Sequence, residues 1–224
     1  MSESSKVRSL FNNLAPSYDR LNRLFSLGMD ISWRRQLVTA VARLNPAMIL
    51  DLACGSGDVA EMLRKALSNA QVVGLDFSRP LLTLAKDRGL PELAEADALK
   101  LPFANGSFDA VTIAFGLRNF SDRKAGLKEI SRVLKNGAVF GLLEFSPPPM
   151  PWKIFWNLYL HHLMPFVAQI VTKQGDSFRY LAQSIAGFPS PSALNHELAS
   201  AGLKLLFSRS FSGRLVQLTV CVRA

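Results

Sequence analysis

The stretch ILDLACGSGD, residues 49–58, combines an apolar run, a glycine-rich turn and the start of a helical pattern. The run MILDLA (48–53) has the length and composition of a buried strand. The segment DVAEMLRKAL (58–67) places its apolar residues at helical spacing. Gly55 and Gly57 allow the turn to take backbone conformations that other residues avoid. The stretch therefore predicts a strand, a tight turn and a helix.

The same alternation continues through the middle of the chain. Further apolar runs with strand character cover residues 71–76, 92–97, 108–115 and 138–145. Helical patterns occupy 78–89, where Pro80 lies near the helix start, and 122–135, which we expect Asn136-Gly137 to cap. This alternation predicts a doubly wound, Rossmann-like parallel sheet with helices on both faces.

Ligands of such sheets bind beyond the carboxyl ends of the strands. We therefore expect three loops, 54–58, 76–78 and 115–120, to meet at one site.

The two ends of the chain depart from the alternation. Residues 152–171 are long and apolar, but Lys153, Pro165 and Gln169 are among the residues that interrupt them. We predict an amphipathic helix pair over the fold and not a membrane span. The last segments, LKLLFSRSF and LVQLTVCV, predict a hairpin turning at Ser212-Gly213 that adds an antiparallel edge to the sheet.

The composition fits one globular domain. The chain has 224 residues, of which 49% are hydrophobic and 19% charged, so a sizeable core can be buried. Cys54 and Cys221 form neither a metal-ligand spacing nor a disulfide framework, which suits a reducing compartment. The first residues lack the apolar core of a signal peptide, and we expect a cytoplasmic protein without a metal site. The expected parts are a helical cap (1–45), a cofactor-binding core (46–150), a helical segment (151–195) and closing helix and strands (196–224).

The positive charge lies outside the core. The net charge is +9, with +4 in residues 1–45, zero in 46–151 and +5 in 152–224. Such basic flanks suit an anionic partner, either a nucleic acid or a lipid surface, and the plainer alternative is charge that serves solubility.

The acids around the glycine turn indicate which ligand it holds. Asp51 lies beside the turn and Asp58 just after it. Two carboxylates would repel a pyrophosphate and attract a cation. Gly55 and Gly57 let backbone approach the ligand closely. The pattern favours a nucleoside that carries an ammonium group, and this describes S-adenosylmethionine.

Two further strand ends carry acids. Asp76 ends the second strand, where a carboxylate can accept hydrogen bonds from both ribose hydroxyls. Asp97 and Ala98 follow the third strand and can meet the adenine amino group. A helix N-cap is the alternative for each acid taken alone.

Four stretches resemble one family, the ubiquinone/menaquinone biosynthesis C-methyltransferases, a branch of the class I S-adenosylmethionine-dependent methyltransferases. They are FNNLAPSYDRLNRLFSLGMDISWRR (11–35), LPFANGSFDAVTIAFGLRNFSD (101–122), RVLKNGAVFGLLEFSPP (132–148) and DSFRYLAQSIAGFP (176–189). The resemblance covers nearly the whole chain. It implies a seven-stranded sheet with an antiparallel last strand, and helices added at the N-terminus and after strand five.

The resemblance also implies a reaction and cofactor contacts. The reaction is C-methylation of a prenylated benzoquinol or naphthoquinol, with demethylmenaquinol to menaquinol as the leading conversion. The cofactor contacts are Ser56, Asp76, Asp97 and Ala98. Ala114 departs from the pattern, since many members have serine there. The C-terminal strand also lacks a histidine that many relatives have.

The loop FGLRNF (115–120) presents Arg118 and Asn119 directly after an apolar strand. A ring carbon of a quinol becomes nucleophilic when the neighbouring hydroxyl loses its proton, and free phenols titrate near 10. We expect Arg118 to stabilise the phenolate and Asn119 to hold a quinol oxygen or a water. A merely solvated arginine is the alternative.

The general base stays open in the sequence. Tyr18 and Asp19 are candidates because their segment should cover the cofactor. His161 and His162 have suitable unperturbed pKa values, and Asp176 is a cap or a substrate contact. We expect no specific role for His196.

The predicted partners follow from this substrate. A prenylated quinol lives in a membrane, so we expect contact with the inner face of the membrane through residues 152–171 and the basic flanks. The residues that follow the fourth strand do not fit a nucleic-acid methyltransferase, and we expect no nucleic-acid partner. A methyltransferase for a tail-free small molecule and a non-catalytic scaffold of a quinone-synthesis complex remain alternatives. The oligomeric state, a homo-oligomer included, is left open.

Overall fold

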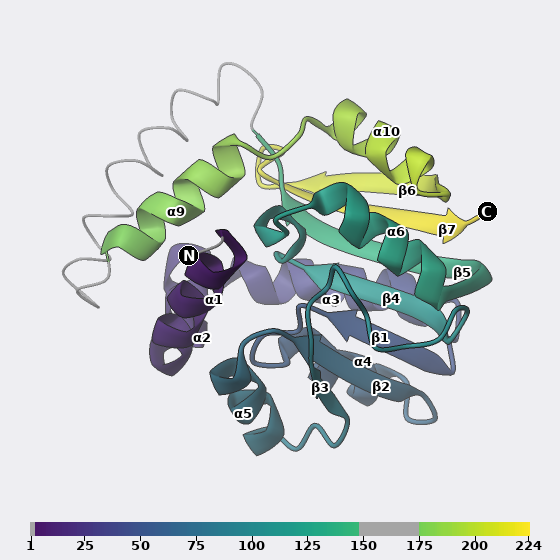
Figure 1. Cartoon of the computed structure of the whole chain (residues 1–224), viewed down its shortest axis with the longest axis horizontal. Helices are drawn as coiled ribbons and strands as arrows, with labels where there is room; N and C mark the ends of the chain where they lie inside the picture. The colour runs from purple at the N-terminus through teal and green to yellow at the C-terminus, as the bar shows by residue number, and fades with distance from the viewer. Residues whose placement is uncertain (1–2, 148–174) are drawn as a thin grey trace.

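The computed structural model of the chain describes residues 3–147 and 175–224. One seven-stranded sheet runs through them in the order β3-β2-β1-β4-β5-β7-β6 (Figure 1). The strands are β1 (Met48–Leu52), β2 (Gln71–Asp76), β3 (Leu93–Glu95), β4 (Phe108–Ala114), β5 (Leu134–Phe145), β6 (Leu203–Phe211) and β7 (Val216–Arg223). Neighbours from β3 to β5 are parallel, and β7 is antiparallel to β5 and β6. The doubly wound sheet with an antiparallel last strand is confirmed.

Helices cover both faces of this sheet. They are α1 (Glu3–Leu14), α2 (Tyr18–Phe25), α3 (Met29–Ala42), α4 (Asp58–Ala66), α5 (Arg79–Asp87), α6 (Arg123–Val133), α9 (Gly175–Ala186) and α10 (Pro191–Ser200), with short 3-10 turns η1 (Ala15–Ser17) and η2 (Leu117–Asn119). The buried residues of α3 and α4 pack in one core cluster, and those of α6 and α10 pack in another on the opposite face. In Figure 1, α6 and α10 lie in front of the sheet and α3 lies behind it.

The glycine turn between β1 and α4 forms because two residues take left-handed backbone. Gly55 has φ of +58° and Gly57 has φ of +89°. A Cβ atom on Gly57 would lie 2.3 Å from the Leu90 side chain, so the turn is packed against the chain segment after α5. The predicted strand, turn and helix are therefore all present, and the turn opens at the carboxyl end of the sheet.

The expected C-cap at Asn136-Gly137 is wrong. Helix α6 ends at Val133, and β5 already begins at Leu134. Gly137 does use left-handed backbone, with φ of +74°, but inside the strand. The β4–β5 register is irregular there, since Leu134 pairs with Phe108 whereas Val139 pairs with Ala110. A glycine after a helical pattern can thus serve a bulge as well as a helix end.

Helices α1 and α2 lie beside the sheet, next to α9 (Figure 1). A small core cluster joins them: Leu14 and Leu21 pack with Ala182 and Ile185 of α9. The chain reverses between α2 and α3 at Leu27 and Gly28, both with positive φ. This arrangement covers the carboxyl ends of the parallel strands.

The predicted helix pair at 152–171 lies outside the described residues. Within residues 3–147 and 175–224, no helix is both long and apolar enough to cross a membrane. The predicted hairpin is confirmed, with Ser212 and Gly213 in its turn.

Candidate active site

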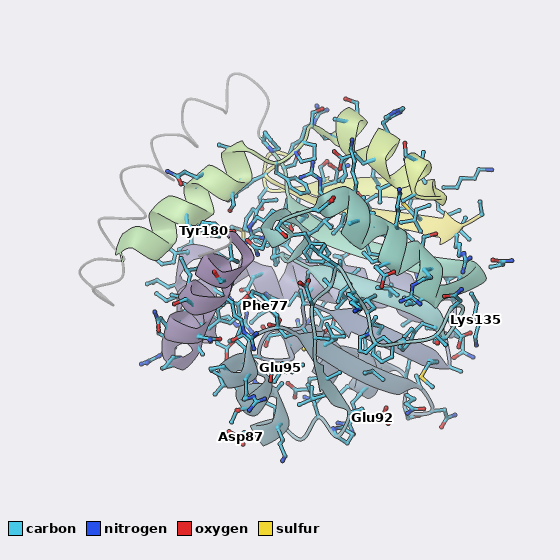
Figure 2. All side chains as sticks on the ribbon, viewed as in Figure 1. Phe77, Asp87, Glu92, Glu95, Lys135 and Tyr180 are labelled. Atoms are coloured by element: carbon cyan, nitrogen blue, oxygen red, sulfur yellow. The ribbon has the colours of Figure 1, made fainter. Side chains whose placement is uncertain are left out.

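A cavity of about 330 Å³ opens at the carboxyl ends of β1, β2 and β4. The three loops expected to meet there each contribute to it, through Gly55, Phe77 and Asn119 among others. Of the residues expected to hold the cofactor, four line it: Gly55, Asp76, Asp97 and Ala98. Phe77 and Glu95, labelled in Figure 2, line the same cavity.

Asp76 is the most constrained acid of this cavity. Its side chain is buried, and its two oxygens accept hydrogen bonds from the backbone N–H groups of Gly55 and Ser78, both at 2.9 Å. Burial raises the pKa of Asp76, although these backbone hydrogen bonds oppose the shift. The carboxylate is thereby held in one orientation, and each oxygen keeps a lone pair for a ligand hydroxyl.

Asp97 is held differently. Its side chain is exposed, and it accepts a hydrogen bond from the Leu99 backbone N–H at 2.9 Å. Ala98, next to it, is partly buried. The pair forms the outer wall of the cavity.

Three residues expected to hold the cofactor lie beside this cavity and not on its wall. Asp51 is 1% exposed and accepts a hydrogen bond from Thr112 Oγ1 at 2.7 Å. Burial raises its pKa to about 7. Ser56 donates a 2.6 Å hydrogen bond to Asp19, and Gly57 lies beneath Leu90. Asp51 and Ser56 line a smaller cavity of about 20 Å³ on the other side of the turn.

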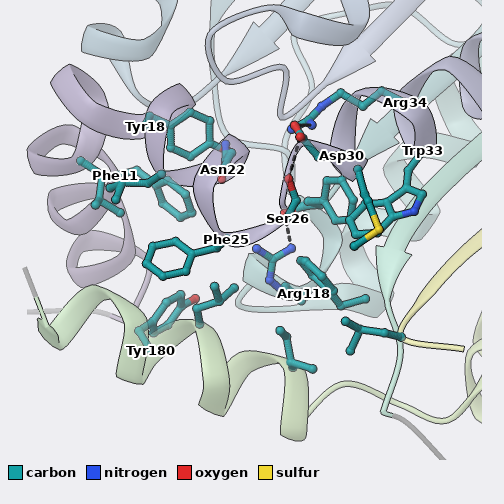
Figure 3. A pocket seen from close by; sticks show the side chains of 18 of the residues that line it. Phe11, Tyr18, Asn22, Phe25, Ser26, Asp30, Trp33, Arg34, Arg118 and Tyr180 are labelled. Atoms are coloured by element: carbon teal, nitrogen blue, oxygen red, sulfur yellow. Dashed lines mark hydrogen bonds and ion pairs between the residues drawn. The ribbon is translucent and has the colours of Figure 1, made fainter. Parts of the chain in front are cut away.

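A second cavity of about 130 Å³ has a mostly apolar wall, with Asn22, Ser26, Asp30, Arg34 and Arg118 among its polar and charged residues. Figure 3 shows it between α2, α3 and α9. Its apolar wall includes Leu10, Leu14, Leu21, Phe25, Trp33, Phe145, Leu181, Ile185 and Leu215. It shares Phe11, Tyr18 and Phe115 with the larger cavity. The two cavities therefore meet at an aromatic wall.

Arg118 lies on the wall of the apolar cavity. Its side chain is only 8% exposed, so the solvated alternative is wrong. Its Nη1 lies 2.7 Å from Oε1 of the buried Glu144 and also donates to the Phe115 carbonyl. The guanidinium lies over the Phe145 ring, 5.2 Å from its centroid. The cation is therefore fixed, and its charge is matched by a carboxylate.

Glu144 was not among the residues predicted from the sequence. This residue sits inside the fifth apolar run, in LLEF, and an acid in such a run was the available signal. Besides the ion pair, it accepts hydrogen bonds from the backbone N–H groups of Arg118 and Phe145. A buried acid with three such bonds fixes the conformation of the loop after β4.

Asn119 faces the larger cavity instead. Its Oδ1 accepts a 3.1 Å hydrogen bond from the Tyr180 hydroxyl of α9. Although they are adjacent in sequence, Arg118 lines the apolar cavity and Asn119 lines the larger one.

Tyr18 borders both large cavities. An added Cβ on Gly55 would touch the edge of its ring at 3.4 Å, so the ring lies directly over the glycine turn. Burial raises the pKa of Tyr18 above 10.0, while Arg34, the Asn22 amide and Arg118 oppose the shift. Tyr18 is thus a neutral phenol at physiological pH, which suits a hydrogen-bond donor better than a base.

Asp19 belongs to a network of ion pairs that joins α2 to the core of the fold. It pairs with Arg88, which also lies 2.6 Å from Asp58. Asp58 in turn is 3.0 Å from Arg23 of α2. Although burial acts in the opposite direction, Arg34, Arg88 and Arg23 lower the pKa of Asp58. The carboxylates of Asp19 and Asp58 are therefore both paired with arginines of the protein itself.

The structure does not test the histidine candidates for the base. His161 and His162 lie outside the described residues, as does the side chain of Asp176. His196 is exposed on α10, where no specific role was expected.

Comparison with known proteins agrees with this geometry. The model of the ubiE/COQ5 methyltransferase family matches residues 1–223. The chain belongs to the ubiE/COQ5 methyltransferase family. The family identified from four stretches of sequence is thereby confirmed.

Curated relatives match most of the ubiE/COQ5 chain. The demethylmenaquinone methyltransferase of Thermus thermophilus is 44% identical over 204 residues, which cover 88% of this chain and 93% of the relative. That of Porphyromonas gingivalis is 39% identical, covering 94% and 89%. The ubiquinone/menaquinone biosynthesis C-methyltransferase of Geotalea uraniireducens is 35% identical, covering 97% and 96%.

Solved structures share the fold of this ubiE/COQ5 protein. The methyltransferase bound to the Trm112 activator of Haloferax volcanii superposes with a TM-score of 0.71 at 18% identity, covering 95% of this chain and 97% of that one. An S-adenosylmethionine-dependent methyltransferase of Thermotoga maritima gives 0.70 at 17%, covering 97% and 100%. The sheet is that of the S-adenosylmethionine-dependent methyltransferases.

The ubiE/COQ5 chain is thus an S-adenosylmethionine-dependent methyltransferase. The larger cavity fits that cofactor, since it has an anchored acid at its base and an open glycine turn beneath Tyr18. Gly116 also lines this cavity, and a larger residue would not fit there because an added Cβ would lie 2.6 Å from the Cβ of Ala53.

Proposed function

We propose that the protein methylates a ring carbon of a prenylated para-quinol, with demethylmenaquinol to menaquinol as the leading conversion. One observation carries the proposal: an apolar cavity with a buried arginine adjoins the cofactor cavity at a shared aromatic wall. The names of the relatives, demethylmenaquinone methyltransferase and ubiquinone/menaquinone biosynthesis C-methyltransferase, support the ring type.

Bound S-adenosylmethionine supplies the methyl group as an electrophile, and the ring hydrogen is lost as a proton. Asp76 would accept the ribose hydroxyls, while Asp97 and Ala98 would meet the adenine. Gly55 lets the cofactor approach the turn. Asp51 and Ser56, on the far side of the turn, would act through the turn's conformation and its charge.

Arg118 would lower the pKa of the quinol hydroxyl next to the accepting carbon. The mostly apolar wall excludes bulk water, and a nearby cation acts most strongly under such conditions. Glu144 keeps the guanidinium in place and offsets part of its charge. Arg118 cannot readily give up its own proton, so a water molecule beside it would carry the quinol proton away.

Tyr18 and Asn119 would align the two reactants. Tyr18 lies where the cavities meet, and its neutral hydroxyl can donate to the quinol. Asn119 faces the cofactor side and is steadied by Tyr180. Close alignment of donor, methyl group and acceptor carbon accounts for much of the rate in such transfers.

We further propose that the protein takes its substrate at a membrane surface. Leu27 is 80% exposed in the turn after α2, and Leu24 and Met29 beside it are also exposed. Phe25, Ser26 and Met29 of the same turn line the apolar cavity. The exposed turn therefore forms the rim through which a prenyl tail could pass.

Two exposed arginines, Arg20 and Arg214, lie on segments that border this rim. The hairpin turn touches it, since Ser212 contacts Met29 at 3.7 Å, and Arg214 is exposed in the same turn. Arg20 is exposed one helical turn before Leu24. An apolar tip with arginines near it suits an anionic bilayer, so binding to vesicles with anionic lipid should weaken as salt is added.

A methyl-transfer assay tests the reaction. Labelled S-adenosylmethionine is offered with reduced demethylmenaquinone or with a reduced demethylated ubiquinone precursor in detergent, each beside its quinone form. Transfer to the reduced rings alone supports the proposal, and the faster ring identifies the pathway. Cofactor binding without transfer to either ring would overturn it in favour of a tail-free acceptor or a scaffold.

A further inference from the structure

Two buried hydrogen-bond donors on the wall of the apolar cavity are unsatisfied. They are Nδ2 of Asn22 and Nε of Arg118, and neither has a hydrogen-bond partner among the described residues. Both residues line the same cavity. Leaving a buried donor unpaired costs stability, and such groups in native proteins call for an explanation.

The two donors reach the cavity from different elements. Asn22 lies on α2, one helical turn after Tyr18, and Arg118 lies in η2 after β4 (Figure 3). The Asn22 amide is near enough to Tyr18 to influence its pKa, but no hydrogen bond of normal geometry joins them. The other polar side chains of this wall include Ser26, Asp30 and Arg34, and these three already bond to one another. Asn22 and Arg118 therefore keep donors that a ligand with two polar atoms could use.

We propose that Asn22 binds the second ring oxygen of the quinol, the one para to the oxygen held by Arg118. This inference rests on the proposed function and extends it. The developing phenolate takes the permanent cation, Arg118, because charge complementarity is strongest there. The other oxygen stays neutral, and the neutral Asn22 amide supplies it with a donor without stabilising a second anion.

The assignment makes Asn22 a specificity residue for rings with two para oxygens. A site built around a hydrogen bond rejects an analogue that lacks the bonded atom, because the site's buried donor is then left unpaired. A ring that keeps only the hydroxyl next to the accepting carbon should therefore lose about 10- to 100-fold in kcat/KM, the equivalent of one such bond.

The test combines a substrate change with a residue change. Wild type and Asn22→Leu are each assayed with the reduced para-diol and with the matching monohydroxy ring. Wild type should prefer the diol by 10- to 100-fold, and Asn22→Leu should lose most of this preference while S-adenosylmethionine affinity stays the same. Asn22→Ala, which removes the whole amide group, should lose it as well if the leucine variant folds poorly.

Asn195→Leu is the matched control. Asn195 lies on α10, and its Oδ1 is also buried without a partner among the described residues, but it lines neither large cavity. It should keep the wild-type preference for the diol. Equal losses on both rings in the Asn22 variants, or a wild type that does not distinguish the rings, would overturn the assignment.

A binding readout separates this inference from the proposed function. Affinities of the diol and the monohydroxy ring are measured by calorimetry in the presence of S-adenosylhomocysteine. If wild type methylates neither ring, the proposed reaction fails. The Asn22 assignment then still stands or falls on whether wild type, and not Asn22→Leu, binds the diol more tightly.

Discussion

Nη1 of Arg118 lies 2.7 Å from Oε1 of Glu144, with 8% and 2% of the respective side chains exposed. A buried pair of this kind does little for net stability compared with an apolar replacement, but losing one partner is expensive. The ion pair instead fixes the position of the guanidinium. Because Glu144 belongs to β5, it holds the Arg118 side chain at the cavity wall and keeps it from turning toward solvent.

Arg118→Ala should lower kcat by about 100- to 1000-fold, the usual cost of removing one electrostatic stabiliser. The S-adenosylmethionine Kd should change little, because Arg118 lines the apolar cavity and not the larger cavity proposed for the cofactor. Single-turnover kinetics and calorimetry measure the two quantities. The double change Arg118→Met/Glu144→Met, which leaves no unpaired charge, separates misfolding from lost catalysis. Equal losses of turnover and cofactor affinity would contradict the role given to Arg118.

Glu144→Gln should destabilise the fold by about 3–5 kcal/mol, since it leaves a buried guanidinium without its counter-ion. Denaturant unfolding monitored by circular dichroism measures this change. Glu61→Gln is a suitable control because the Glu61–Lys65 pair is exposed and contributes little. If both variants unfold at the same denaturant concentration, Glu144 does not anchor the loop as described.

Asp76→Asn should weaken S-adenosylmethionine binding by about 10- to 100-fold, the equivalent of one or two hydrogen bonds to a charged acceptor. The amide oxygen can still accept from the Gly55 N–H, but the NH2 group then faces the Ser78 N–H, so one of the two anchoring hydrogen bonds is lost. Asp87→Asn, at the exposed end of α5 (Figure 2), should bind like wild type. Calorimetry decides the matter, and an unchanged Kd for Asp76→Asn would remove this residue from the site.

Asp51 should make stability depend on pH. Its folded pKa, about 7, lies above the value of 3.8 for a free side chain, so the folded state holds the proton more tightly. The free energy of unfolding should therefore fall as pH rises from about 4 to about 7, and level off above. The Asp51→Asn variant should lose this pH dependence. Its free energy of unfolding should exceed that of wild type by the largest amount at about pH 8. Parallel pH profiles for the two proteins would rule out the burial effect.

Leu27→Asp should reduce binding to anionic vesicles at least about tenfold, because it places a carboxylate at the apolar tip of the rim. Leu44→Asp is the matched control, since Leu44 is also exposed but follows the opposite end of α3. Vesicle co-sedimentation, with activity on a detergent-dispersed substrate as a folding check, gives the comparison. Equal binding by both variants would place the membrane contact elsewhere.

The core of the fold was predictable because its signals are local. The strand of Gln71–Asp76 and the glycine turn at Gly55 follow from short apolar runs and from backbone needs that neighbours in sequence define. Gly137 misled for the same reason. Its left-handed backbone was foreseeable, but whether it ends a helix or forms a bulge depends on β4, which lies elsewhere in the sequence.

The site was predictable in part. Asp76 and Arg118 stand out because each follows an apolar run at a strand end. Ser56, by contrast, turns away from the larger cavity toward Asp19, a contact that only the packing of α2 decides. Glu144 and Asn22 were missed because their roles depend on burial and on partners distant in sequence, and no periodicity records either.

Phe11 and Tyr18 both belong to the N-terminal helices, and both form the wall between the two cavities. Helices α1 and α2 thus supply part of the wall that the two cavities share. A displacement of α1 and α2 that opened one cavity would therefore open the other as well. Exchange of the ligands of the two cavities would then be coupled, because the same two side chains separate one cavity from the other.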